Sequence, residues 1–271
     1  MKKKSTLQKK TTIFSFLSFI LLPYYITSTA FPADSSTLLL QGIDSFHEAY
    51  NNWDEKKFGE SLLFFKKASQ IGPKDGLAEY WSGTVYFFLS LHNLFSLEKA
   101  PDKVRGVDNA KKGIDILTQS IELSPGFSES YALRGVLRGI LIKMKPFSAF
   151  TQGQKVGKDR EKALALDTYN PRVHYLTGVS FWFAPEILGG SDKALGHLLE
   201  AEQLFEKEKQ TQKNGLLPSW GQSTCLAFMG DIYLSQKQNK KAYAYYKKAL
   251  QANPSDPLAL RGMEKMDGMN N

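Results

Sequence analysis

Apolar and polar residues do not alternate with a two-residue period along this chain, and no cluster of β-branched residues lies between turn signals. Because such patterns mark β-strands, we expect little or no strand. Small and aromatic residues instead recur between Ser223 and Asp256, at Met229-Gly230, Tyr233, Ala242, Tyr246 and Ala249, followed by Pro254. Small residues let two antiparallel helices approach closely, and a proline stops the second helix.

These spacings resemble the tetratricopeptide repeat, a 34-residue helix–turn–helix unit. One such unit cannot bury its apolar face alone and must stack on neighbouring units. The resemblance therefore implies an all-α fold, a solenoid of about five helix–turn–helix repeats with a C-terminal capping helix. It also implies a protein that binds a partner.

Four upstream segments fit the repeat pattern less well than the last one. Small residues, aromatic residues and terminal prolines fall in register in several of them, for example Phe65, Ala68 and Pro73 in the first. The expected repeats span residues 42–75, 76–127, 128–169, 170–214 and 223–256, and the capping helix spans 256–266. All of them belong to one repeat domain, residues 31–271.

The first thirty residues have the layout of a secretory signal peptide. Five lysines precede the uncharged run Ile13–Leu22, and Ser28-Thr29-Ala30 supplies small residues for cleavage before Phe31. The apolar run is short for a membrane span, which needs about 20 residues. We expect a chain exported to the periplasm or envelope of a bacterium; an uncleaved anchor is the alternative, and would be the chain's only membrane contact.

The positive charge of the chain comes mostly from this segment. Without its five lysines the formal net charge falls from +8 to +3, because the segment contains no Asp or Glu. The remaining charge is poor evidence for nucleic-acid binding, and we expect none. The single cysteine, Cys225, lies on a repeat helix and is expected to be a small buried residue.

No sequence motif indicates catalysis. The four histidines, His47, His92, His174 and His197, belong to no HExxH pattern and pair with no cysteine at a metal-ligand spacing. Nucleophile-elbow, phosphate-loop and dinucleotide-binding motifs are absent from the sequence. We therefore expect no enzyme activity, no catalytic residue, no metal and no cofactor.

The resemblance also implies which residues face inward. In tetratricopeptide proteins the first helix of each repeat lines the concave surface. The matching positions here are mostly aromatic: Phe46, Tyr50, Trp53, Tyr80, Phe87, Phe88, Arg172, Tyr175, Trp182 and Phe183. Such rings suit the capture of a ligand or a peptide. Arg172 is the one good anion partner among them, so binding of a peptide carboxylate is disfavoured.

The alternative for this face is packed core, because aromatic residues at helical spacing are usually buried. In that case the insertions after Phe95 and Met144 could fold back over the groove, with Phe147 and Phe150 as candidates for the covering side chains.

Exported repeat proteins of bacterial envelopes provide a narrower resemblance. The features that carry it are Asn170-Pro171-Arg172, the stretch from Pro185 to Gly190, and Pro218-x-Trp220-Gly221. They are similar in outline to the T component of TRAP-type solute transporters, although no lipid-attachment cysteine is present. Two functions follow: a scaffold or adaptor for protein–protein interaction in the envelope, or a periplasmic binding protein for an apolar small molecule.

Overall fold

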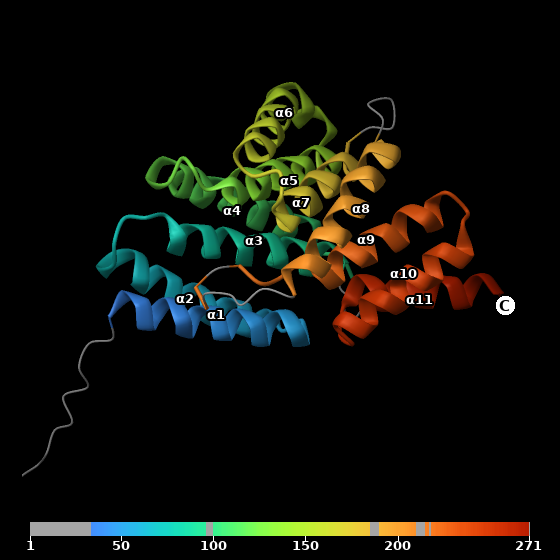
Figure 1. The fold of residues 1–271 in the computed structure, drawn as a ribbon, viewed down its shortest axis with the longest axis horizontal. Helices are drawn as coiled ribbons and strands as arrows, with labels where there is room; N and C mark the ends of the chain where they lie inside the picture. Colours follow the sequence, from blue (N-terminus) through green and yellow to red (C-terminus); the bar gives the residue numbers. More distant parts are fainter. Residues whose placement is uncertain (1–33, 96–99, 185–189, 210–214, 217, 271) are drawn as a thin grey trace, which may run out of the picture. The chain divides into compact units, whose positions relative to one another are not determined.

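The computed structural model describes residues 34–95, 100–184, 190–209, 215–216 and 218–270. All regular structure in these residues is helical, and Figure 1 shows the helices stacked in chain order. The helices are α1 Ser35–Asn52, α2 Glu55–Ile71, α3 Leu77–Phe95, α4 Lys103–Leu123, α5 Ser128–Met144, α6 Ala149–Leu166, α7 Pro171–Trp182, α8 Gly190–Glu208, α9 Gln222–Ser235, α10 Asn239–Ala252 and α11 Pro257–Asn270, with the 3₁₀ turn η1 Pro146–Ser148 between α5 and α6.

Consecutive helices form five antiparallel pairs, α1–α2 to α9–α10, and α11 packs on the last pair. The helical repeat solenoid expected from the sequence is confirmed in the described residues. Two limits differ from the expected ranges. α1 begins at Ser35, well before Gly42, because the Asp34 carboxylate accepts a hydrogen bond from the Thr37 amide (2.7 Å) and caps the helix. α11 continues beyond residue 266 to Asn270.

Short polar side chains set the start of several helices. Asp54, Asp102 and Asn170 each accept hydrogen bonds from amides of the first turn of α2, α4 and α7. Asp256 does the same for α11, at 3.1 Å from both the Leu258 and Ala259 amides. These caps satisfy amides that a helix cannot pair by itself, so the sequence fixes where each hairpin turns.

A glycine on the first helix of four pairs faces a large side chain of the second helix. The facing residues are Gly42 and Phe65, Gly83 and Leu117, Gly178 and Leu198, and Gly230 and Tyr246. A Cβ added at Gly230 would lie 2.4 Å from the Tyr246 ring, and one at Gly262 of α11 would lie 2.2 Å from the same ring. The ring is thus held between two helices that approach closely only because both positions lack a side chain.

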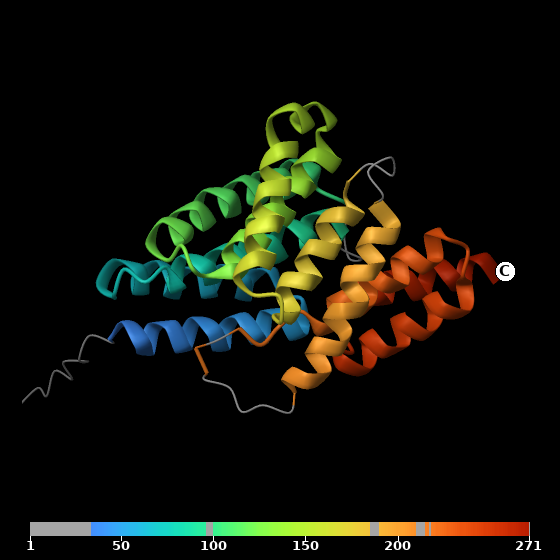
Figure 2. The ribbon, with the colours of Figure 1, turned by 45° about the horizontal axis from the view of Figure 1, so that its top comes forward.

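The stack curls until its first and last pairs meet. The Tyr50 hydroxyl at the end of α1 lies 2.6 Å from the Ser223 hydroxyl of α9. The Asn253 side-chain amide, after α10, donates to the Tyr50 carbonyl oxygen (3.3 Å). Figure 2 shows the orange segment before α9 running beside α1 within this curl. The inner side of the solenoid therefore closes around that segment.

None of the described helices is long and apolar enough to cross a membrane.

Candidate functional site

The inner face of the solenoid contains a continuous set of aromatic rings. Phe46 and Tyr50 of α1 stack with centroids 6.1 Å apart, and the Phe88 ring of α3 meets them at 5.7 and 5.1 Å. Phe87 contacts Phe88 at 5.1 Å. The helices that carry these rings are covered on the outside by the second helix of each pair. The inner rings therefore need cover on their other side.

That cover comes from the segment before α9. The Trp220 ring lies 5.4 Å from Phe88 and 6.2 Å from Tyr175, and only 2% of its surface is exposed. Its indole N–H donates to the Tyr80 hydroxyl (3.1 Å). The same segment is also attached at Leu216, whose carbonyl oxygen accepts from the Trp81 indole (3.2 Å). Trp220 thus fills the inner face as an internal ligand would.

Eight of the ten side chains expected on an exposed concave face are buried: Phe46, Tyr50, Tyr80, Phe87, Phe88, Arg172, Tyr175 and Phe183. Trp53 and Trp182 are half-buried and pack at the edge of the core. The structure brings the aromatic residues of α1, α3 and α7 together, but as packed core, which is the alternative that the sequence left open.

The expectation that Phe147 and Phe150 cover the groove is wrong. Their side chains are 88% and 90% exposed. Pro146 ends α5 and begins η1, and α6 starts immediately afterwards and packs back along α5. A turn this short keeps both rings at the tip of the hairpin.

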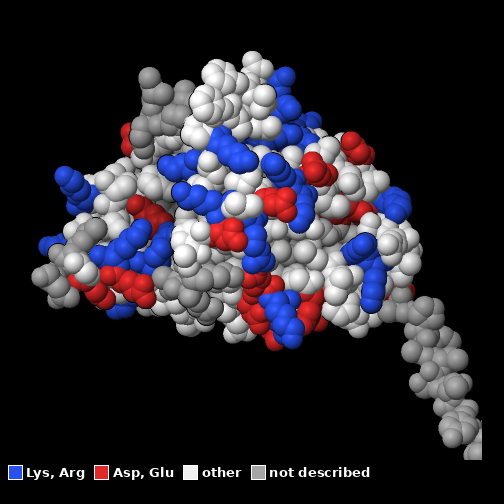
Figure 3. Space-filling model, turned by 180° about the vertical axis from the view of Figure 1, so that it is seen from behind, with Lys and Arg blue, Asp and Glu red and all other residues white. Residues whose placement is uncertain are grey.

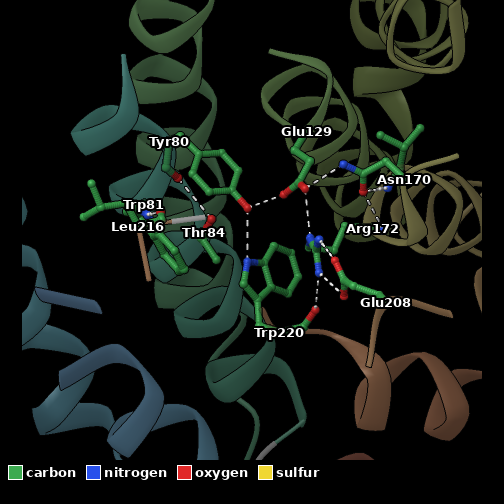
Figure 4. A network of polar contacts seen from close by, with 10 residues as sticks. Tyr80, Trp81, Thr84, Glu129, Asn170, Arg172, Glu208, Leu216 and Trp220 are labelled. Atoms are coloured by element: carbon green, nitrogen blue, oxygen red, sulfur yellow. Dashed lines mark hydrogen bonds and ion pairs between the residues drawn. The ribbon is translucent and has the colours of Figure 1, made fainter. Parts of the chain in front are cut away.

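Arg172 lies at the centre of a buried polar network that fixes the Trp220 segment (Figure 4). Its Nε donates to Glu129 (2.8 Å), Nη1 and Nη2 bind both carboxylate oxygens of Glu208, and Nη1 also reaches the Trp220 carbonyl oxygen (3.4 Å). Tyr80 donates to the second oxygen of Glu129, and Asn170 donates to the first (2.8 Å). The guanidinium therefore has all its strong partners within the chain.

The charges in this network depend on one another. Burial by itself would lower the pKa of Arg172, but the carboxylates of Glu129 and Glu208 outweigh it, and the pKa is raised. Burial, followed by the nearby Glu129, raises the pKa of Tyr80 well above its ordinary value. Arg172 stays charged and Tyr80 stays a donor at any ordinary pH. Sequence analysis singled out Arg172 as the one good anion partner on the inner face; in the structure its anionic partners are Glu129 and Glu208.

At the edge of the covered face a half-open pocket of about 210 Å³ remains. It is lined by residues of α1, α8 and the segment leading into α9: His47, Tyr50, Asn51, Phe205, Glu208, Lys209, Ser219, Trp220, Gly221, Gln222 and Ser223, with Ala252 of α10. His47 and Ser219 close one side, with Nε2 and Oγ 3.2 Å apart. On the other side Gln222 and Lys209 both donate to Glu206 (2.7 and 3.0 Å). We call this the edge pocket.

Of the ten expected residues, Tyr50 alone lines the edge pocket. Three of the others, Ser219, Trp220 and Gly221, were missed because they lie between two repeats, outside the repeat register. The one sequence feature that marks this segment is Pro218-x-Trp220-Gly221. In the structure Gly221 has a positive φ (106°), which residues other than glycine rarely adopt.

Two further groups have a defined environment. Cys225 is a free, fully buried thiol, as expected, and burial raises its pKa. His197 Nδ1 lies 3.3 Å from His174 Nδ1. Burial, together with His174 and Arg160, lowers the pKa of His197 to about 4. Among the described residues, no group of three or more His, Cys, Asp or Glu could hold a metal ion.

Comparison with known proteins identifies the repeat and the fold. The family described as "Tetratricopeptide repeat" matches residues 224–256. A thermophilic TPR protein of Thermus thermophilus superposes with a TM-score of 0.59 at 17% sequence identity, covering 85% of this chain and 97% of that one. The HusA haemophore of Porphyromonas gingivalis gives a TM-score of 0.55 at 16% identity, covering 71% of this chain and 90% of that one. No curated protein matches the sequence. Residues 224–256 are thus a tetratricopeptide repeat, and the chain has the fold of a tetratricopeptide-repeat protein.

Proposed function

We propose that this chain is an exported, non-enzymatic tetratricopeptide-repeat adaptor of the bacterial cell envelope, and that it binds a protein partner at the edge pocket. The observation that carries the proposal is the filled inner face. Trp220 and the Arg172 network occupy the surface where this fold would hold an extended ligand, and the edge pocket is the part of that face still open to solvent.

The composition of the edge pocket suits a polypeptide. Its rim offers donors and acceptors from His47, Asn51 and Gln222, while Phe205 and Trp220 supply apolar surface. A polypeptide needs both kinds of contact, for its backbone and for an inserted side chain. The volume of about 210 Å³ lies below the roughly 300–1,000 Å³ typical of small-molecule sites. It is large enough for one or two side chains of a larger partner.

A pair of variants at adjacent positions tests this site. Asn51 lines the edge pocket, whereas Asn52 does not, and both are exposed on α1. In affinity capture from a periplasmic fraction, Asn51→Arg should lose the partner that the unaltered chain retains, and Asn52→Arg should retain it. Equal retention by all three proteins would place the partner elsewhere. Recovery of lipid or small molecules without any protein would contradict the adaptor function.

Export has its own test. The mass of the chain recovered from the envelope fraction should correspond to an N-terminus near Phe31. Recovery of the unprocessed chain in the cytoplasmic fraction would contradict export.

A second function, binding of an apolar small molecule, is favoured by one observation. A groove of about 640 Å³ runs between α2 and the α3–α4 pair, with Leu62, Leu63, Tyr86 and Ile116 in its lining. This volume is within the small-molecule range. A TRAP-type transport partner would fit this function.

One of the structures with a similar fold is described as a haemophore, so haemin is a suitable first probe for the groove. A saturable absorbance change that Leu62→Glu abolishes would support the second function. An unchanged haemin spectrum would count against haem as the ligand.

A further inference from the structure

The tip of the α5–α6 hairpin carries two of the most exposed apolar side chains of the described residues. Phe147 lies in η1 and Phe150 in the first turn of α6, at 88% and 90% exposure. A spacing of three residues in a helical turn places both rings on the same side. The hairpin stands at the top of Figures 1 and 2, away from α1. Two protruding rings with almost no cover from their own chain indicate a contact surface.

The tip is also strongly basic. The sequence contains no Asp or Glu between Glu129 and Asp159. Arg134 and Arg138 in this stretch share one carboxylate, that of Asp159, in a buried pairing with Arg134 at 2.7 Å. The four lysines nearest the rings, Lys143, Lys145, Lys155 and Lys158, are exposed, and none takes part in an ion pair within the described part of the chain.

The basic surface continues onto the start of α4. Lys145 and Met144 border a hollow together with Lys103, Lys111 and Asp108, and the Asp108 carboxylate is paired with Lys112 (2.8 Å). The neighbouring Val104 is 81% exposed. Figure 3 shows uncharged atoms at the top of the molecule with lysine and arginine to their right and below them, whereas positive and negative residues are mixed over the rest of that face. The tip therefore combines protruding apolar groups with an unneutralised positive rim.

We propose that the tip of the α5–α6 hairpin binds an anionic membrane surface. Phe147 and Phe150 enter the interfacial layer of the bilayer, and Lys143, Lys145, Lys155 and Lys158 contact lipid phosphates. Apolar side chains with lysines beside them are the combination that peripheral membrane binding needs, because neither apolar insertion nor charge alone gives a stable attachment. The sequence predicts membrane contact only for the N-terminal signal segment, so the tip would be a second membrane-binding surface.

A membrane fits these observations better than a protein partner does. A protein would have to supply a pocket for each of two projecting rings, whereas a bilayer surrounds any ring that enters it. The charges agree, since all four lysines at the tip are free to meet a surface of the opposite sign. Attachment through the tip would leave the edge pocket open to a partner.

Vesicle sedimentation of the full chain tests the proposal. The unaltered protein should sediment with vesicles of equal parts phosphatidylglycerol and phosphatidylcholine, and not with phosphatidylcholine alone. Phe147→Ser with Phe150→Ser should weaken binding by about tenfold or more, since both apolar anchors are lost. Raising the salt from about 0.1 to about 0.5 M should weaken binding of the unaltered chain through screening. The control is Ile71→Ser with Tyr169→Ser, which alters two exposed apolar residues outside the tip and should change nothing.

A probe at the tip separates this contact from any contact made by the N-terminal segment. Cys225 is buried, so a Phe150→Cys variant can be labelled selectively with an environment-sensitive nitrobenzoxadiazole dye. Its emission should rise and shift to the blue on adding anionic vesicles, while a dye at Tyr243→Cys should not respond. Unchanged emission at position 150 on adding anionic vesicles would overturn the proposal, because this probe reports on the tip and not on the N-terminal segment. So would capture of an envelope protein that requires both phenylalanines while vesicles do not bind.

Discussion

Two groups of aromatic side chains in this molecule have the same chemistry and opposite surroundings. Phe87, Phe88 and Trp220 lie inside the curl of the solenoid with almost no exposed surface, whereas Phe147 and Phe150 project from the tip of the α5–α6 hairpin. Phe87 and Phe88 lie on α3, which is covered by α4 and by the segment before α9 that carries Trp220. The tip rings lie on a turn too short to reach any other helix.

The comparison shows that the position of a residue in the repeat register does not by itself determine whether its side chain is exposed. An inward-facing position is open only if nothing else in the chain covers it. Here the covering residue, Trp220, comes from a connection between two repeats, and its indole and carbonyl groups are held by Tyr80 and Arg172.

The largest expected effect comes from exchanging one ring of each group for alanine. Trp220→Ala would leave a void between Phe88 and Tyr175 and remove a partner from Tyr80, so it should cost about 3–5 kcal/mol of unfolding free energy. Phe150→Ala should stay within about 0.5 kcal/mol of the unaltered chain. Equilibrium unfolding in urea measures both. Similar losses of unfolding free energy in the two variants would contradict the difference in burial between the inner rings and the tip rings.

A smaller effect with opposite signs is expected for two glycines. A methyl group at Gly230 meets the Tyr246 ring, whose hydroxyl is bound to Asp231 (2.7 Å) and which also packs tightly against Gly262 of α11, so the ring has little room to move. Gly230→Ala should therefore destabilise by about 1–3 kcal/mol. Gly153 of α6 has open space at its Cβ position, and Gly153→Ala should stabilise by about 0.5–1 kcal/mol through helix propensity. Thermal melts of the two variants should shift in opposite directions, and shifts of the same sign would be the contrary result.

The smallest effect is a dependence of stability on pH. Burial raises the pKa of Asp256 to about 6, against opposing hydrogen bonds from the Ala259 and Leu258 amides. Because the folded chain then holds a proton that the unfolded chain releases near its ordinary pKa of 3.8, the unfolding free energy falls as pH rises from about 4 to 6. Asp256→Asn should remove this fall in unfolding free energy, whereas Lys155→Gln at the tip should leave the fall unchanged.

His197 acts in the opposite direction, because its lowered pKa makes stability fall as pH drops below its ordinary value of 6.5. His197 is present in the unaltered chain and in both variants. The difference in their pH dependence of unfolding free energy therefore reports on Asp256 alone. An unchanged pH slope in Asp256→Asn would contradict the assignment.

The fold could be predicted from the sequence because small residues, caps and prolines act locally. Gly230, Ala242 and Ala249 mark a close helix contact whatever else the chain does, and Asp256 caps α11 through its own neighbours. The inward residues of α1, α3 and α7 also gather on one side of their helices. What covers that side could not be predicted, because the contacts of Trp220 with Tyr80 and Phe87 join residues more than 130 positions apart.

The burial of Arg172 shows the same limit. By register it is a free cation on a binding surface, and in the structure it is 4% exposed between Glu129 and Glu208. Neither carboxylate lies near it in the sequence, so no local pattern indicates that it is paired.

The most direct test of the filled inner face is the solvent accessibility of Trp220 in solution. The chain labelled with 5-fluorotryptophan should show four fluorine resonances, one for each tryptophan. The Trp220 resonance, assigned by its absence in Trp220→Phe, should be broadened by a soluble nitroxide as little as that of the fully buried Trp81, and less than those of the half-buried Trp53 and Trp182. Broadening of the Trp220 resonance beyond those of Trp53 and Trp182 would show that the inner face is open and would contradict this account.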